Sequence, residues 1–246
     1  MTTPRPGGTR SKNGRANGDP HLFDRPLVTV DVVILALRER RLCALLAKRS
    51  IEPFLGAWAL PGGYIHPDED TDLDAAARRI LREKTGAEAP YLEQLQAFGN
   101  RRRDPRGWTA TFAYFALVDA DSLSIVAGPG TTEVAWRDIT DKRLKSGLAF
   151  DHAEILSCAA HRLRAKVEYT SLPVHLLPEK FTLPDLQQVY EDVLGRRIDK
   201  SAFRKRMATA DFLEPIAGER RMASHRPAQI YRVKRGMRPV FFDRTI

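Results

Sequence analysis

The chain has 246 residues, of which 43% are hydrophobic, and its formal net charge is +9. That composition is typical of a globular protein, and no apolar stretch approaches the roughly 20 residues that cross a bilayer. The chain has only two cysteines, Cys43 and Cys158, which is too few for a disulfide scaffold. They do not stand at a metal-ligand spacing either, so reduced thiols in a cytoplasmic protein are favoured. No apolar region follows the basic residues at the N-terminus, so we expect no secretory signal and no membrane partner.

The positive charge is distributed unevenly along the chain. Residues 1–26 carry five basic and two acidic side chains, residues 27–195 carry 21 and 24, and residues 196–246 carry 14 and five. The C-terminal segment therefore has an excess of nine positive charges, equal to that of the whole chain. This asymmetry favours a polyanionic partner at that end, and a solvated basic face is the alternative.

Residues 1–25 are rich in glycine, proline and arginine and have few large apolar side chains, so we expect a flexible basic arm. Whether the arm is idle or contacts nucleic acid is open. A folded domain is predicted over residues 26–170. Its first β-branched, apolar run, Leu27 to Leu37, is followed after a polar turn by Leu42 to Ala47, which indicates a β-hairpin.

Strands and helices then alternate. A strand over 58–65 ends at a Gly-Gly turn, and the next helix is expected between Thr71, as its N-cap, and Gly86, as its terminating glycine. Within this helix Ile80 should face the core, whereas Arg79 and Glu83, four residues apart, share another face. Further strands are expected over 92–99, 108–118 and 134–136, and a long amphipathic helix over 150–167. This order predicts an α/β fold, an α/β/α sandwich around a mixed sheet.

The strand-turn-helix segment carries a spaced set of residues that resembles a known motif. Gly63 is followed after five residues by Glu69, and Arg79, Glu83 and Gly86 stand close to the end of the helix. The set resembles the box of the Nudix hydrolases, which reads glycine, five residues, glutamate, seven residues, arginine-glutamate, a hydrophobe, any residue, two glutamates, any residue, glycine and a hydrophobe. Here two extra residues separate Glu69 from Arg79.

The order of the residues resembles the Nudix box, but two of the metal-binding carboxylates are replaced by residues of other types. Counting back from Gly86, Ile80 stands where the first glutamate of the cluster belongs and Lys84 where the last belongs. Hydrolysis in this family uses divalent cations held by carboxylates, which an apolar side chain and an ammonium cannot replace. We therefore predict no catalytic residues and no required metal or cofactor, with Glu69 and Glu83 able to hold Mg²⁺ only weakly.

A nucleoside diphosphate compound is the expected ligand of this domain. Paired glycines let the backbone approach a phosphate closely. The loop over 101–107 is dense in arginine and either cradles a diphosphate through forked hydrogen bonds or is a solvated tip. Arg79 is expected to pair with carboxylates inside the site rather than to contact the ligand. The predicted ligand-binding residues are Trp58, Gly62, Gly63, Glu69, Arg79, Glu83, Arg101, Arg103 and Arg106.

A second domain is expected over 179–246, after a linker over 171–178 that contains two prolines. Thr182 caps a helix over 183–194, Asp199 starts a basic helix over 200–210, and strands over 212–216 and 229–233 flank a charged loop. This order is typical of a winged helix-turn-helix domain, whose basic helix fits the major groove of DNA. The predicted DNA-binding residues are Lys200, Ser201, Arg204, Lys205, Arg206, Arg220, Arg221 and Arg226.

The two halves together resemble one family, the Nudix-related transcriptional regulators of bacterial NAD metabolism. Its resemblance covers residues 26–233 and is strongest at 60–63, 103–107, 150–152, 181–191 and 202–206. It implies a homodimeric regulator, expected here to be a repressor, on a palindromic DNA operator near genes of NAD biosynthesis or salvage. It also implies ADP-ribose as the effector that binds the Nudix domain and releases the DNA.

Two other functions stay open at this stage. One is an active Nudix hydrolase of ADP-ribose-like substrates with a basic accessory domain that docks nucleic acid. It would need nearby aspartates such as Asp68, Asp70, Asp72 and Asp74 to rebuild a metal site. The other is an interaction module that binds no ligand.

Overall fold

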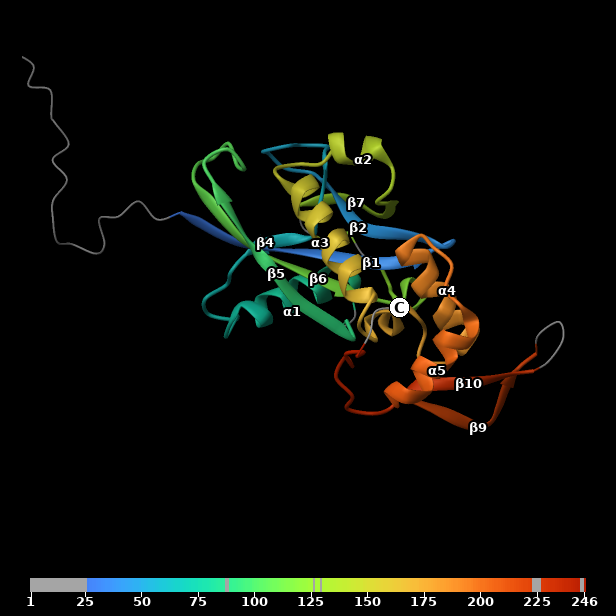
Figure 1. Ribbon diagram of the computed structural model, residues 1–246. Helices are drawn as coiled ribbons and strands as arrows, with labels where there is room; N and C mark the ends of the chain where they lie inside the picture. The colour runs from blue at the N-terminus through green and yellow to red at the C-terminus, as the bar shows by residue number, and fades with distance from the viewer. Residues whose placement is uncertain (1–25, 87–88, 126, 129, 223–226, 244–245) are drawn as a thin grey trace, which may run out of the picture.

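The computed structural model describes residues 26–86, 89–125, 127–128, 130–222, 227–243 and 246 (Figure 1). The predicted N-terminal arm and Arg226 lie outside these residues. Among the helices of this described part, none is both long and apolar enough to cross a membrane.

A mixed sheet forms the N-terminal domain. Its strands are β1 (Leu27–Arg38), β2 (Arg41–Arg49), β3 (Trp58–Ala59), β4 (Gly62–Tyr64), β5 (Tyr91–Asn100), β6 (Thr109–Leu117) and β7 (Thr131–Asp138). The strand order is β3-β2-β1-β6-β5, with β4 paired to β1 and β7 to β2. β1 and β6 run parallel, and the other pairs are antiparallel. The predicted hairpin and mixed sheet are confirmed.

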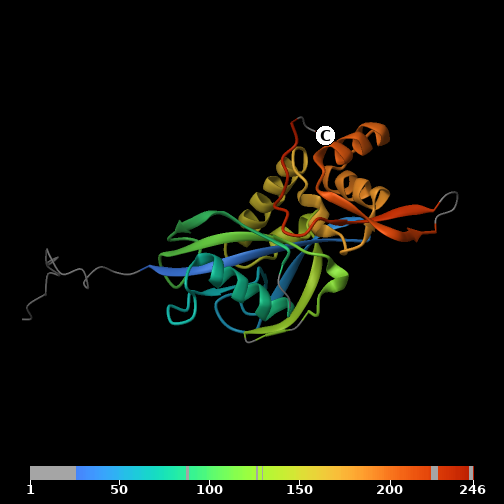
Figure 2. The same cartoon turned by 90° about the horizontal axis from the view of Figure 1, so that it is seen from below.

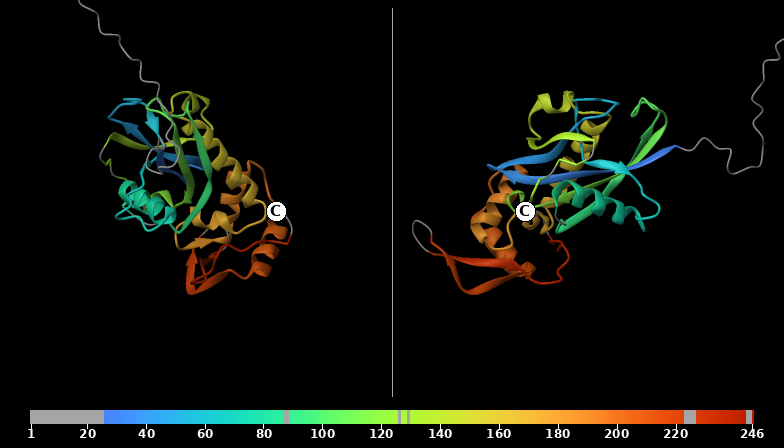
Figure 3. Two further views of the ribbon diagram at one scale, coloured as in Figure 1. Left: turned by 90° about the vertical axis from the view of Figure 1, so that its left-hand side faces the viewer. Right: turned by 180° about the vertical axis from the view of Figure 1, so that it is seen from behind.

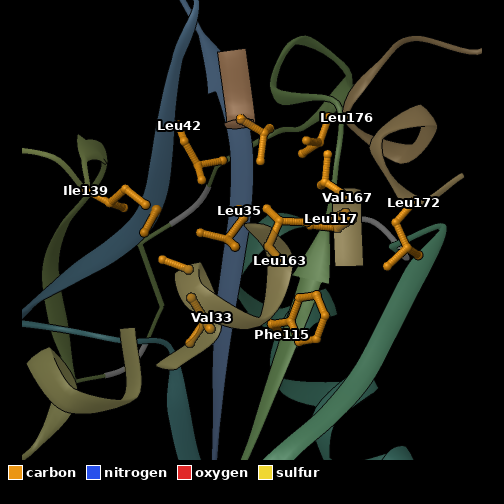
Figure 4. Close-up of a cluster of buried hydrophobic side chains, with 14 of the residues drawn as sticks. Val33, Leu35, Leu42, Phe115, Leu117, Ile139, Leu163, Val167, Leu172 and Leu176 are labelled. Carbon is orange, nitrogen blue, oxygen red and sulfur yellow. The ribbon is translucent and has the colours of Figure 1, made fainter. Parts of the chain in front are cut away.

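Helices cover both faces of the sheet, because successive side chains of a strand point to opposite faces. On β1, Val30, Val32 and Ile34 belong to a buried cluster with α1 (Leu73–Thr85). The alternate residues Val33 and Leu35 belong to a second cluster with α3 (His152–Val167), which Figure 4 shows. Figure 2 shows α1 and α3 on opposite sides of the sheet, and the predicted α/β/α sandwich is confirmed.

The cap predicted for α1 is wrong by one residue. Asp72, not Thr71, is the N-cap, and its carboxylate accepts a hydrogen bond from the Ala75 amide at 2.7 Å. The predicted end is confirmed, because Gly86 adopts the left-handed conformation (φ 66°) that glycine tolerates best. Ile80 is 1% exposed, so it faces the core as expected.

The C-terminal domain has the winged helix-turn-helix order. It contains β8 (Phe181–Thr182), α4 (Leu183–Leu194), α5 (Lys200–Ala210), β9 (Leu213–Arg221) and β10 (Ala228–Val233), and its sheet order is β8-β10-β9. The predicted caps are confirmed, with Thr182 and Asp185 forming a capping box and Gly195 ending α4 in the left-handed conformation. The first wing strand is longer than predicted and reaches Arg221. Short helices η1 (Ala120–Ser122) and α2 (Lys142–Ser146) lie in connecting segments of the N-terminal domain.

The segment predicted as a linker is part of the core. It forms the 3-10 helix η2 (Leu172–Leu176), in which Leu172 is 1% exposed. One buried cluster runs from the α3 face of the sheet through η2 to Phe203 of α5. The Tyr190 hydroxyl donates to the Thr170 carbonyl at 2.7 Å, and Arg40 of the β1–β2 turn pairs with Asp192 of α4 at 2.9 Å. Figures 2 and 3 show the C-terminal domain packed on the same side of the sheet as α3.

Because this core is continuous, we predict that Leu172→Ala destabilises both domains together. The cavity it leaves should lower the free energy of unfolding by about 2–5 kcal/mol. Urea unfolding would be followed by tryptophan fluorescence, since Trp58, Trp108 and Trp136 all lie in the N-terminal domain, and by circular dichroism of the whole chain. Both transitions should coincide and shift to lower urea.

The matched control is Leu55→Ala, the same change at a side chain that is 60% exposed, which should alter stability by less than about 0.5 kcal/mol. A fluorescence transition that ignores Leu172→Ala, while circular dichroism shifts, would mean that the domains unfold independently.

Candidate ligand cleft and nucleic-acid interface

A cleft of about 200 Å³ lies where β1, β2 and β4 meet the end of α1. The loop over 101–107 and the segment before α3 close its other sides. Polar and charged side chains line it together with Ile51, Tyr64 and Phe150. Apolar walls with a few converging polar groups are typical of a small-molecule site.

Arg103 is buried beside the cleft and is paired with two acids. Its side chain is 4% exposed, and its guanidinium donates to both oxygens of Asp151 at 2.9 and 3.0 Å. Its Nη2 lies 3.4 Å from Asp31 Oδ2, and Nη1 donates to the Thr109 hydroxyl at 3.2 Å. Burial is the largest single effect and works against the charge, but the hydrogen bonds to Asp151 and the negative charges of Asp151, Asp31 and Asp104 together outweigh it, so the pKa of Arg103 is raised. The alternative of a solvated loop tip is wrong for Arg103.

His152 and Gly62 complete this buried network. His152 Nδ1 accepts the Leu60 amide at 2.9 Å, so its proton sits on Nε2, which lies 3.7 Å from Asp31 Oδ1. Burial lowers the pKa of His152 below its usual value, which keeps the ring neutral near pH 7. A Cβ on Gly62 would lie 2.0 Å from Asp31 Oδ1, so only glycine fits beside this carboxylate.

Two further arginines line the cleft. Arg106 pairs with Asp104 at 2.7 Å and donates to the Tyr64 hydroxyl at 2.8 Å. Arg49 lies over the Phe150 ring, 4.9 Å from its centroid, and donates to the Pro53 carbonyl at 2.7 Å. An arginine beside an aromatic ring can bind an anionic group, while a planar group can stack on the guanidinium or on the ring.

Of the predicted ligand-binding residues, the cleft brings together Gly62, Gly63, Arg103 and Arg106. Trp58 and Arg101 do not line it. The Trp58 ring instead packs against the Arg137 guanidinium at 4.3 Å, and Arg101 is exposed. Their predicted contact with the ligand therefore has no support from the geometry of the cleft.

The acidic residues of the box lie outside the cleft as well. The side chains of Glu69 and Glu83 are 67% and 50% exposed, and they pair with His66 and Arg79 respectively. Arg79 also holds Asp70 through two hydrogen bonds of 2.9 and 2.8 Å, which lower the pKa of Asp70 to about 2. Arg79 therefore pairs with carboxylates, the structural role expected for it, and does not line the cleft.

These residues do not fit the metal site of a Nudix hydrolase. Within the described residues, no group of three or more histidine, cysteine, aspartate or glutamate side chains could hold a metal ion. The positions of Glu69 and Glu83 do not support the weak Mg²⁺ site predicted for them, because Glu69 pairs with His66 and Glu83 pairs with Arg79. Lys84 lines the cleft from the last turn of α1 instead.

Sequence reasoning missed several residues of the cleft, namely Asp31, Arg49, Lys84, Phe150 and His152. Asp31 had a readable signal, because it is a lone acid in an otherwise apolar strand and is 5% exposed. The only sequence signal at Phe150 and His152 is the family resemblance over residues 150–152. Arg49 carried no signal in the sequence, since its position depends on how β2 meets the segment before α3.

The exposed face of α5 carries most of the predicted DNA-binding residues. Phe203 and Met207 are 1% and 2% exposed and hold the helix on the core. The side chains of Lys200, Ser201, Arg204 and Lys205 lie on exposed faces. Arg206 is an exception, because it is half-buried and its guanidinium lies 5.6 Å from the centre of the Phe242 ring. Its predicted DNA contact is therefore not supported.

The wing adds two exposed arginines. Arg220 and Arg221 lie at the end of β9, and Arg221 pairs with Asp185 at 2.6 Å. Figure 1 shows the β9–β10 hairpin projecting away from the rest of the molecule, as a wing that reaches along a nucleic-acid backbone would.

Comparisons with known proteins match both halves. Residues 25–157 match the model of the NUDIX domain, and residues 173–233 match that of the NrtR DNA-binding winged helix domain. The ADPR responsive transcriptional repressor NtrR of Acinetobacter baylyi is 42% identical over 85% of this chain and 83% of its own length. The ADP-ribose pyrophosphatase of Methanocaldococcus jannaschii is 31% identical over 55% of this chain and 73% of its own.

Solved structures of Shewanella oneidensis NrtR are also similar. Its complex with a 27mer DNA has a TM-score of 0.81 at 38% identity and covers 89% of this chain and 99% of that one. Its NUDIX domain in complex with ADP ribose has a TM-score of 0.54 at 41% identity, over 60% of this chain and 94% of that one. With a Nudix domain, an NrtR-type winged helix domain and these relatives, the chain belongs to the NrtR family of Nudix-related transcriptional regulators.

Proposed function

We propose that this protein is a transcriptional repressor that binds double-stranded DNA and releases it when ADP-ribose occupies the cleft of its Nudix domain. One observation carries the proposal. A cleft lined by cations is joined by a continuous core to a domain with an exposed basic helix, and the described residues include no group of three or more side chains that could hold a metal ion. Relatives named as an ADPR responsive repressor and as a complex with DNA support it.

The finer assignment follows from the family. We propose a homodimer on a palindromic operator near bacterial genes of NAD biosynthesis or salvage, acting in the cytoplasm. A dimer presents two recognition helices with twofold symmetry, which a palindrome matches. ADP-ribose is a product of NAD turnover, so its concentration reports on the pool that such genes maintain.

The proposed mechanism uses α3 as the connection. Asp151 and His152 stand at its start beside the cleft, and its inner face packs in the cluster that reaches α5. A ligand that binds the guanidinium of Arg103 weakens its ion pair with Asp151. The packed core transmits the resulting displacement of α3 to the winged domain. Ligand and DNA then favour different placements of that domain, and by reciprocity DNA must weaken ligand binding by the same factor.

An active hydrolase is the second candidate, because a Nudix relative is named as an ADP-ribose pyrophosphatase. AMP release from ADP-ribose with Mg²⁺ or Mn²⁺ distinguishes the two. We expect turnover far below the rate of about 1 per second that ordinary enzymes exceed, since neither Glu69 nor Glu83 lines the cleft. Turnover at or above that rate would establish the hydrolase.

DNA binding should depend on α5. The double variant Arg204→Ala/Lys205→Ala removes two exposed cations, so operator affinity should fall about tenfold or more at 0.15 M salt. The slope of log affinity against log salt should become shallower by about 1–2, because fewer counterions are released. Fluorescence anisotropy would use the palindrome upstream of the nearest NAD-biosynthesis operon, with a random duplex for comparison.

The chain offers a matched control on α2. Lys142→Ala/Arg143→Ala removes the same two charges from adjacent exposed positions of another helix and should leave operator affinity unchanged. Equal losses for both double variants would mean that net charge, rather than α5, determines binding.

Release by ADP-ribose should depend on Gly62. In Gly62→Ala the new methyl group meets Asp31 Oδ1, so the carboxylate must leave its place near Arg103. We expect ADP-ribose affinity to fall at least about tenfold, or ~1.4 kcal/mol, while operator affinity without ligand is kept. Titration of ADP-ribose into the preformed DNA complex checks this, because the variant should stay bound.

The control for this change is Gly147→Ala, whose Cβ would meet only ordinary contacts, the nearest atom lying 3.8 Å away. It should release DNA like the natural protein. If Gly62→Ala also releases DNA normally, the cleft around Asp31 is not where the effector acts.

A further inference from the structure

The residue that stands in place of a metal-binding glutamate is a buried cation. Lys84 falls in the last turn of α1, is 6% exposed as a residue and lines the cleft. Its Nζ lies 3.0 Å from the position that a Cβ on Gly128 would take, so the chain packs against the ammonium where glycine leaves room. The side chain is therefore held at the cleft rather than extended into solvent.

No hydrogen bond or ion pair joins Lys84 to any residue that the structure describes. The negative charge of Glu83 favours the charged form of Lys84, but Glu83 Oε1 accepts a hydrogen bond from Arg79 at 3.1 Å. Burial lowers the pKa of Lys84. A buried ammonium without a counterion is costly, so an anion that enters the cleft would stabilise it.

Most other charges of the cleft are already balanced. Arg103 is paired with Asp151 and lies 3.4 Å from Asp31, and Arg106 is paired with Asp104. Arg49 donates to backbone carbonyls of the β2–β3 loop and has no carboxylate partner among the described residues. Two cations, Arg49 and Lys84, thus face the cleft without a paired acid. The diphosphate of a nucleotide sugar carries one negative charge on each phosphate, so each of these two cations can pair with one phosphate.

We propose that Lys84 takes the place of the divalent cation in this Nudix cleft, so that the diphosphate of the ligand is neutralised by the chain itself and binds without metal. This inference rests on the proposed function, in which the cleft takes ADP-ribose. It also defines the ligand class as nucleoside diphosphates that need no metal, and it makes Lys84 a specificity-determining residue.

Replacing the metal ion by an ammonium lets the cleft bind a diphosphate without hydrolysing it. An ammonium supplies a positive charge and three N–H donors to phosphate oxygens. It cannot coordinate a water molecule or lower its pKa, as a metal ion must to create the attacking hydroxide. A ligand held by Lys84 is therefore bound in its ground state and left intact.

The test is calorimetric titration of ADP-ribose into the full-length protein, with EDTA or with Mg²⁺. The natural protein should bind equally well in both. Lys84→Met keeps the length of the side chain and removes its charge, so affinity should fall about tenfold or more in both conditions. Adenosine, which has no phosphate, should bind both proteins alike.

Lys84→Glu gives the sharper result. It returns a carboxylate to the position that the Nudix box assigns to one, so ADP-ribose should bind very weakly in EDTA and should regain affinity when Mg²⁺ is added. The matched control is Lys142→Met on exposed α2, which should change nothing. Operator binding without ligand verifies that each variant is folded.

The outcomes separate this inference from the proposed function. Binding of ADP-ribose by the natural protein only with Mg²⁺, or equal binding by Lys84→Met, would overturn the role of Lys84 and leave the repressor intact. No binding of ADP-ribose by the natural protein in either condition would overturn the proposed effector, and this inference with it. Should the Lys84 variants fail to fold, the comparison of EDTA with Mg²⁺ in the natural protein decides.

Discussion

The cleft depends on one buried cation, Arg103. A guanidinium that is only 4% exposed needs its charge balanced and its donors satisfied, and Asp151 and Asp31 do this from two elements that are far apart in the chain. The pairing ties the loop over 101–107 to β1 and to the start of α3. It also explains Gly62, since Asp31 occupies the space that a side chain there would need. The floor of the cleft is thus an ion-paired joint, with one cation between two carboxylates, that connects segments far apart in the chain.

That joint lies at one end of α3, and the winged domain packs at the other. The core cluster runs without interruption from the sheet through η2 to α5, and Tyr190 holds the Thr170 carbonyl just beyond the helix. Close-packed interiors transmit displacement rather than absorb it, and they favour discrete arrangements over gradual bending. In the mechanism proposed above, a ligand that competes for Arg103 acts on α3, and α5 packs in the same core cluster as α3. The continuous core thus joins the cleft and the winged domain without a flexible linker.

The fold could largely be predicted from sequence, because periodicity and caps are local properties. The hairpin of β1 and β2, the core position of Ile80 and the helix ends at Gly86 and Gly195 all follow from such patterns. The cleft could be predicted only in part. The sequence left the loop of Arg103 open between a phosphate cradle and a solvated tip, because the burial of Arg103 depends on acids 48 and 72 residues away. The sequence predicts a linker over residues 171–178, because it shows two prolines there but not the tertiary contacts that bury Leu172. Thr71 and Asp72 are both good caps, so their order could not be decided locally.

The Nudix box of this chain keeps the residues that shape α1 but lacks metal-binding carboxylates that hydrolysis would need. Gly86 ends α1, Ile80 fills the core, and Arg79 holds Asp70, so these positions are required by the fold whatever the site does. Of the two positions where the box places metal-binding glutamates, position 80 now carries a core side chain and position 84 carries an ammonium that lines the cleft. For a sensor the change has a physical benefit. A ligand can shift an equilibrium between two states only while it stays bound, and a site that cut its ligand would discard the signal during detection. A fixed ammonium in place of metal ions keeps the diphosphate bound and removes the means of cutting it.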